Sequence, residues 1–172
     1  MTSKRSHRSN RSGDIADSPK WSCDNTIQQA LATAESRCRE KGLRFTPVRR
    51  KVLELLLQEK KAIGAYEILE RLSETGFGSQ PPVAYRSLGF LTRHGFAHKI
   101  ERLNAFVACI CPGEKHAPAF MICRLCDSVT EAHSFSLNHV LGSAAEAKGF
   151  QIEHSTVEAE GICMTCVEQL RI

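Results

Sequence analysis

The sequence predicts an α+β protein in two parts: an N-terminal winged helix-turn-helix domain and a smaller C-terminal α/β domain of strands and one helix. Three observations support this prediction. Helical hydrophobic repeats occupy residues 27–94, the repeat then changes to that of short strands, and two Cys-x-x-Cys pairs enclose residues 123–166. The charge is also divided, since residues 1–20 carry a net +3, residues 21–102 a net +5 and residues 103–172 a net −4. A basic first part favours a polyanion as its partner.

Residues 1–22 are predicted to form a disordered basic tail, because they are rich in Ser and Arg and have few apolar side chains to offset the entropy of ordering. The tail is either a solvated extension or a basic arm that adds phosphate contacts. No apolar run approaches the roughly 18 residues of a membrane-spanning helix, and no apolar signal segment follows the basic N-terminus. We therefore expect a cytoplasmic protein, in which disulfides are rare.

Four helices are expected before residue 95. The first is followed by Gly42, the residue type that ends helices in a left-handed conformation. Its apolar positions recur at helical spacing: Ile27, Leu31, Ala34 and Cys38. The second begins at Thr46-Pro47, an N-cap followed by proline. A third runs from about residue 65 to 73 and a fourth from about 83 to 94, where Gly95 ends it.

Residues 96–101 and 105–109 then predict two short strands. Helices followed by a hairpin are typical of a winged helix-turn-helix, whose last helix enters the major groove of DNA while the wing contacts the backbone. Tyr85 and Arg86 lie in the first turn of that helix, where side chains reach base edges. Arg49 and Arg50, near the start of the second helix, are candidates for phosphate contacts. The alternative interpretation is a small helical domain with an ordinary basic face.

The C-terminal part carries two Cys-x-x-Cys pairs: Cys123 with Cys126, and Cys163 with Cys166. Each pair supplies two thiolates from one tight turn, and two pairs complete the tetrahedron that structural zinc prefers. Such a site contributes folding free energy directly. The alternative is a set of redox thiols or two disulfides, which an intracellular location disfavours.

Strands are predicted at residues 118–123 and 128–132, a helix at 135–148 that Gly149 ends, and an extended stretch through Phe150, Ile152 and Val157. Three strands and one helix would make a small core that zinc stabilises. The sheet would have exposed edges, and pairing across a twofold axis would cover one of them.

Three segments resemble the ferric uptake regulator superfamily: LRFTPVRR at residues 43–50, PPVAYRSL at 81–88 and GFAHKIE at 95–101, followed by the two cysteine pairs. The resemblance covers roughly residues 27–168 and is strongest for the zinc-sensing members. It implies a winged-helix DNA-binding domain at 23–102, a hinge at 103–112 and a dimerisation and zinc-binding domain at 113–172. It further implies a homodimeric repressor whose zinc-loaded form binds AT-rich palindromic operator DNA and shuts off zinc uptake genes.

The resemblance also implies a regulatory zinc site formed by His98, Cys109, His116 and Glu131. Each residue alone has an ordinary structural interpretation, but together two imidazoles, a thiolate and a carboxylate fit a tetrahedral site. A metal held by all four would fix the angle between the domains. We therefore expect two zinc ions per monomer, one structural and one regulatory.

Some positions depart from the superfamily's usual pattern. Val83 stands where relatives commonly have threonine, so a helix cap worth about 1 kcal/mol is expected to be missing. Cys111 is interpreted as a bystander thiol, with substitution for Cys109 as the alternative. Further histidines are interpreted as solvated or core residues, with a third metal site that includes Glu158 as the alternative; they are His133, His139 and His154.

Two other classes of function stay open. The first is an iron, manganese or peroxide sensor of the same fold, which Cys109 disfavours because a thiolate ligand favours the softer zinc. The second is a redox-switched zinc-thiol protein that releases zinc on oxidation. An enzyme is not expected, since the sequence shows neither a Gly-rich phosphate loop nor a nucleophile elbow, and the predicted zinc sites leave no position open for water.

Overall fold

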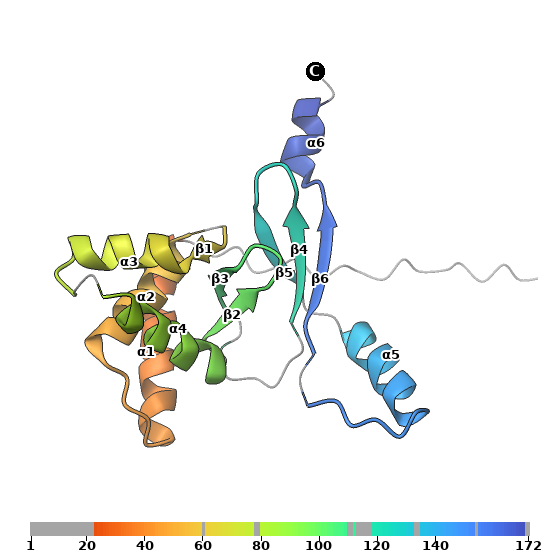
Figure 1. Ribbon diagram of the computed structural model, residues 1–172, viewed down its shortest axis with the longest axis horizontal. Coiled ribbons are helices and arrows are strands. Elements are labelled where there is room, and N and C mark those ends of the chain that lie inside the picture. The colour runs from red at the N-terminus through yellow and green to blue at the C-terminus, as the bar shows by residue number, and fades with distance from the viewer. Residues whose placement is uncertain are drawn as a thin grey trace, which may run out of the picture.

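The computed structural model describes residues 23–59, 61–77, 80–109, 112, 118–132, 135–153 and 155–170 of the 172-residue chain. The predictions for residues 1–22 and for Cys111, His116, His133 and His154 fall outside the described residues, as does the side chain of His139. Figure 1 shows a helical N-terminal part beside a β-rich C-terminal part, which is the predicted α+β order.

The helical part comprises α1 (Cys23–Glu40), α2 (Pro47–Gln58), α3 (Ala65–Glu74) and α4 (Pro81–Arg93). Each helix buries the apolar positions that its repeat predicts, and together they form one hydrophobic core; examples are Leu31, Val52, Ile68, Leu72, Leu88 and Leu91. Cys38 is buried in the same core, as its place on the apolar stripe predicts. No helix among the described residues is both long and apolar enough to cross a membrane.

The predicted end of α1 and start of α2 are confirmed, whereas α4 begins at Pro81, before the predicted residue 83. The Thr46 side chain accepts a hydrogen bond from the Arg49 amide at 3.4 Å and caps α2. Gly42 has φ +63°, its N–H donates to the Arg39 carbonyl, and the next amide donates back to Cys38. This pair of bonds satisfies the last carbonyls of α1, and it requires a left-handed residue that glycine adopts without strain.

Helix α4 has no side-chain cap, as expected, but its N-cap residue is Gln80 and not Val83. Pro81 and Pro82 occupy the first two positions and have no N–H groups, so two of the donors that a cap would satisfy do not exist. The Val83 N–H, which is the next donor, bonds to the Gln80 carbonyl at 2.9 Å. The helix therefore begins without a side-chain cap, and its first available N–H bonds to the backbone.

The first sheet has the antiparallel order β1-β3-β2, with β1 (Ile63–Gly64), β2 (Ala97–Ile100) and β3 (Ala105–Ala108). The predicted hairpin is thus present as β2 and β3. Strand β1 was not predicted, because two residues are too few to show an alternating pattern. The range 103–112, expected to be a hinge, includes β3, which is hydrogen-bonded into this sheet.

The second sheet has the order β5-β4-β6, formed by β4 (Ala119–Cys123), β5 (Val129–Ala132) and β6 (Val157–Gly161). Strand β4 pairs antiparallel with β5 and parallel with β6. The predicted extended stretch therefore becomes a strand only from Val157 onward. Helix α6 (Met164–Leu170), which follows the second cysteine pair, was not predicted because its seven residues show no helical repeat.

Helix α5 (Phe135–Glu146) is present as predicted, but it lies to one side of the second sheet and not against it (Figure 1). The expected compact core of three strands and one helix is therefore wrong for the single chain. Leu141 of α5 and the following Phe150 and Ile152 are exposed. A hydrophobic repeat shows that a helix has an apolar face, but it does not specify which surface covers that face.

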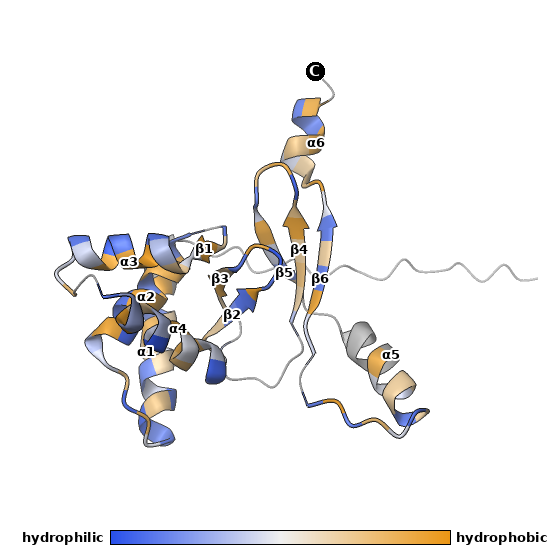
Figure 2. Ribbon diagram, in the orientation of Figure 1, coloured by the Kyte–Doolittle hydropathy of each residue, from blue (hydrophilic) through white to orange (hydrophobic). Residues whose placement is uncertain are grey.

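The β2–β3 hairpin lies between two hydrophobic clusters. Ala97 and Phe106 point into the helical core, whereas Ile100, on the opposite face of the hairpin, packs with Phe120 and Ile122 of β4. Figure 2 shows β4 coloured mostly hydrophobic. Because strand side chains alternate between faces, one short hairpin can contact both parts of the chain.

Candidate metal centres and nucleic-acid interface

Two clusters of metal-ligating side chains occur among the described residues. The first comprises Cys123, Cys126, Cys163 and Cys166, whose sulfurs all lie within 4.8 Å of one another. Cys123 ends β4, whereas Cys163 lies between β6 and α6. Because β4 and β6 are parallel, with Cys123 opposite Gly161, the two cysteine turns meet at the same end of the sheet.

The spacing of these sulfurs suits a metal ion with tetrahedral coordination. Cys126 Sγ lies 3.7 Å from Cys163 Sγ. With a Zn–S bond of about 2.3 Å, a tetrahedron separates its sulfurs by about 3.8 Å, whereas a disulfide bond is about 2.05 Å long. All four of these cysteines are free thiols. The four predicted residues therefore form one cluster whose geometry and soft donors fit zinc.

Hydrogen bonds set the protonation of this cluster. The Cys163 N–H donates to Cys123 Sγ at 3.3 Å, and this bond, followed by one from the Leu125 amide, lowers the pKa of Cys123 to about 6. Side-chain hydrogen bonds to Cys163 and Cys126, followed by burial, raise the pKa of Cys166 to about 12. Cys166 therefore keeps its proton beside neighbouring thiolates unless a cation lies between them, because a coordinating thiol is deprotonated.

The second cluster comprises His98, Cys109 and Glu131, whose ligand atoms also lie within 4.8 Å of one another. His98 is on β2, Cys109 directly follows β3, and Glu131 is on β5, so the cluster joins the two sheets. The Cys109 N–H donates to the Phe96 carbonyl at 3.0 Å and extends the hairpin by one residue pair. This pairing places Cys109 on the face of the hairpin that carries His98.

The second cluster is more buried and more mixed in its donors than the first. The Glu131 side chain is only 4% exposed, and its Oε1 lies 3.6 Å from Nε2 of His98. The Phe120 ring lies 5.5 Å from the His98 ring and closes one side. Imidazole, thiolate and carboxylate together fit zinc better than iron or manganese. The structure brings together three of the four predicted ligands, and the fourth, His116, lies outside the described residues.

Helix α4 carries the predicted nucleic-acid contacts. Tyr85 is 50% exposed, and Arg86 is also exposed. Both line a surface depression of about 560 Å³, whose other lining residues are Arg49, Pro82, Gly89, Phe90 and Arg93. Three arginines around one depression create the positive potential that attracts phosphates. Arg50, the remaining predicted contact, is half-buried on α2 and does not line the depression.

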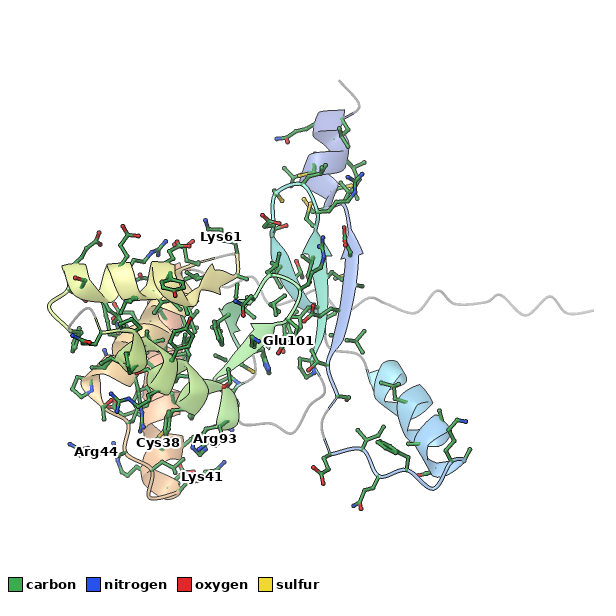
Figure 3. The ribbon with its side chains drawn as sticks, viewed as in Figure 1. Cys38, Lys41, Arg44, Lys61, Arg93 and Glu101 are labelled. Carbon is green, nitrogen blue, oxygen red and sulfur yellow. The ribbon has the colours of Figure 1, made fainter. Side chains whose placement is uncertain are left out.

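Two of these arginines are oriented by the domain itself. Arg86 Nε donates to the Pro82 carbonyl at 3.0 Å, one turn back on α4. The Arg49 guanidinium lies 3.7 Å from the centre of the Phe90 ring and donates to the Arg44 carbonyl. Arg49, near the start of α2, therefore contacts α4 through Phe90 and also lines the depression. Figure 3 shows Arg44 and Arg93 on this part of the molecule.

Glu158 has a contact that the sequence did not indicate. The sequence suggested it only as a partner in a third metal site, but its carboxylate accepts hydrogen bonds from the amides of Glu101 and Arg102 at 2.7 and 3.2 Å. Arg102 Nε also lies 3.0 Å from Glu160. Figure 3 shows Glu101 where the hairpin approaches the second sheet. No sequence pattern reveals these contacts, because they depend on the pairing of β6 with β4.

Comparisons with known proteins agree with this arrangement. The profile of the ferric uptake regulator family matches residues 40–160. The zinc uptake regulation protein of Escherichia coli (strain K12) is 38% identical over 144 residues, which cover 83% of this chain and 84% of that protein. A solved structure of a zinc uptake regulator complexed with zinc and DNA has a TM-score of 0.82 at 36% identity, and it covers 86% of this chain and 99% of its own. The holo form of XcZur has a TM-score of 0.75 at 39% identity, with 81% and 98% covered. The chain belongs to the ferric uptake regulator family.

Proposed function

We propose that this protein is a zinc-responsive transcriptional repressor, which binds palindromic operator DNA as a zinc-loaded dimer and represses zinc uptake genes. The observation that carries the proposal is the cluster of His98, Cys109 and Glu131, which joins the hairpin of the helical part to the second sheet. The similarity to zinc uptake regulators, one of them solved with zinc and DNA, supports the same function.

We propose two zinc sites per monomer. The four cysteines would hold a structural zinc that stabilises the second sheet and α6. The regulatory site would use His98, Cys109 and Glu131, with His116 as the fourth ligand. Zinc bound there would connect the β2–β3 hairpin of the helical part to β5 of the second sheet. It would therefore favour the arrangement in which the hairpin and β5 lie together. The Cys109 thiolate is a soft donor, which favours zinc over iron or manganese at this site.

We propose that α4 reads the operator. Tyr85 and Arg86 would contact base edges, and Arg49 and Arg50 would contact phosphates. Arg86 is oriented by Pro82 and can approach guanine in a bidentate geometry. The depression lined by Arg49, Tyr85 and Arg86 would lie against the DNA backbone beside the groove.

We propose that the C-terminal part forms the dimer, with the join between the two domains after β3. Supporting this, exposed apolar side chains gather in the C-terminal half; they are Met121, Leu125, Leu141, Phe150, Ile152, Met164 and Leu170. Met121 lies on the face of β4 opposite Phe120, so this face of the sheet is available to a second copy. Two copies related by a twofold axis would match a palindromic operator. We propose a cytoplasmic location and a regulatory function without catalysis, and the similarity to a zinc uptake regulation protein supports the regulatory function.

One experiment tests the proposal. Metal content per monomer is measured together with operator binding across a buffered zinc titration, for the wild type and for Cys109→Ser. We expect one chelator-resistant zinc and one exchangeable zinc, with DNA binding that follows the second. Cys109→Ser should keep the tight zinc and the dimer but bind operator poorly in zinc. One tight zinc with no zinc-dependent DNA binding would reject the proposal and favour a redox-switched zinc-thiol protein, and selective activation by iron or manganese would favour another metal sensor.

A further inference from the structure

Two carboxylates lie on either side of Phe120, on the face of the second sheet that meets the hairpin. Phe120 of β4 is paired with Glu131 on β5 and with Glu158 on β6, so the three side chains form one row across the sheet. Directly paired residues in adjacent strands point to the same face. Glu131 belongs to the His98 and Cys109 cluster, whereas Glu158 has no part in either cysteine-containing cluster.

The Glu158 carboxylate holds the turn that follows β2. Its two oxygens accept hydrogen bonds from the consecutive amides of Glu101 and Arg102, at 2.7 and 3.2 Å. The turn itself is closed by the Asn104 N–H, which donates to the Glu101 carbonyl at 3.1 Å. Two successive N–H groups directed at one carboxylate form a charge-assisted contact, which is stronger than neutral hydrogen bonds. Glu160, which lies opposite Ile122, adds an ion pair with Arg102 that is exposed to solvent.

The hairpin is consequently attached to the second sheet at both ends of β2. His98, near the start of β2, meets Glu131, and the turn after Ile100 meets Glu158. Between these two points, the buried side chains of Ile100 and Phe120 pack together. A strand attached at two points and packed between them has little freedom to rotate. The position of His98 at the start of β2 therefore depends on how the turn after Ile100 is held.

We propose that Glu158 is a positioning residue for the regulatory zinc site, which acts by fixing the β2–β3 turn and thereby the placement of His98 relative to Glu131. The inference rests on the proposed function of that site. Zinc affinity and attachment of the turn are then coupled, and the coupling is reciprocal. Removing the charge of Glu158 should weaken the exchangeable zinc about tenfold, equivalent to about 1.4 kcal/mol. Operator binding should require correspondingly more zinc.

The variant Glu158→Gln tests this proposal, because it keeps the shape of the side chain while removing its charge and presenting an amide N–H to one of the two donors. Glu160→Gln is the matched control: it lies two residues away on the same strand and loses only an exposed ion pair, which contributes little. The measurements are the zinc affinity of the exchangeable site by chelator competition, the absorption spectrum of that site loaded with Co²⁺, and the hydrogen exchange of the turn.

We expect faster amide exchange at Glu101 and Arg102 in Glu158→Gln, with and without the exchangeable zinc. We also expect an affinity about tenfold weaker, an altered cobalt spectrum and an intact four-cysteine zinc, whereas Glu160→Gln stays within about twofold of the wild type. Faster exchange with unchanged zinc affinity and spectrum would overturn the proposal. Loss of the four-cysteine zinc or of the fold would also overturn it, by making Glu158 a general structural residue. If the wild type shows no zinc-dependent DNA binding, the proposed function fails, but the exchange, affinity and spectra still decide the role of Glu158.

Discussion

Phe120 offers a quantitative test of how the two parts of the chain are coupled. It is 1% exposed, and it is one of three fully buried residues in the cluster where the hairpin meets the second sheet, with Ile100 and Ile122. Replacing a buried phenylalanine by alanine typically costs about 3–5 kcal/mol. Phe120 also packs within its own sheet, so we assign roughly half of the lower figure, about 1.5 kcal/mol, to the contact between the two parts.

Phe120→Ala should therefore weaken the exchangeable zinc site on the order of tenfold or more, since each 1.4 kcal/mol is a factor of ten. The control is Leu72→Ala, which removes an equally buried side chain from the helical core, away from the second sheet. Leu72→Ala should lower the free energy of unfolding by about 2–5 kcal/mol. It should leave the affinity of the exchangeable zinc site within a few-fold of the wild type.

The assay combines urea unfolding of each variant with chelator competition for the exchangeable zinc. An exchangeable-site affinity in Phe120→Ala that stays within threefold of the wild type would refute the reasoning, because the apolar contact would then not support the arrangement that brings His98 to Glu131. Equal losses of zinc affinity in both variants would refute it too, since the effect would follow overall stability and not the contact between the parts.

Other predictions concern the cysteine cluster, the DNA surface and a helix cap. Cys126→Ser should lose the chelator-resistant zinc and with it the fold or the dimer, as seen by metal analysis and circular dichroism, because one of four ligands is removed. The zinc affinity of the four-cysteine site should fall as pH decreases, most steeply below about pH 6. Cys123, whose pKa is lowered to about 6, then also binds a proton that zinc must displace. A zinc affinity that does not change between pH 5 and 7 would contradict this. Arg86→Ala should weaken specific operator binding by about 1–3 kcal/mol without changing zinc affinity, measured by fluorescence anisotropy against operator and scrambled DNA. Thr46→Ala should lower the free energy of unfolding by about 1 kcal/mol, through loss of the cap on α2, and an unchanged melting temperature would contradict the cap.

Local structure in this chain could be predicted because its causes lie within a few residues. Gly42 and Gly95 end helices where only a left-handed residue satisfies the last carbonyls, and both have positive φ. Thr46 and Pro47 likewise start α2. The missing side-chain cap on α4 was likewise predicted, but Val83 is not at the N-cap, because Pro81 and Pro82 precede it as the first two residues of the helix.

Within the candidate site, the sequence indicated residues but not contacts. The spacing of Cys123, Cys126, Cys163 and Cys166 predicts their cluster, because two tight turns with thiols have few other uses in such a chain. The surface against which the apolar face of α5 packs could not be predicted, since an amphipathic repeat defines a face and not its partner. Helix α6 and strand β1 were too short to give a repeat.

Residue type and local spacing were enough to predict the longer helices and strands, the metal-binding chemistry of the cysteine pairs and the family resemblance. The folded chain alone shows that one face of the β2–β3 hairpin meets the row of Glu131, Phe120 and Glu158. That row exists because β4 pairs with β5 on one side and with the distant β6 on the other in a particular register. A shift of one residue in either pairing would turn a carboxylate to the opposite face, and no local pattern fixes the register of strands so far apart in sequence.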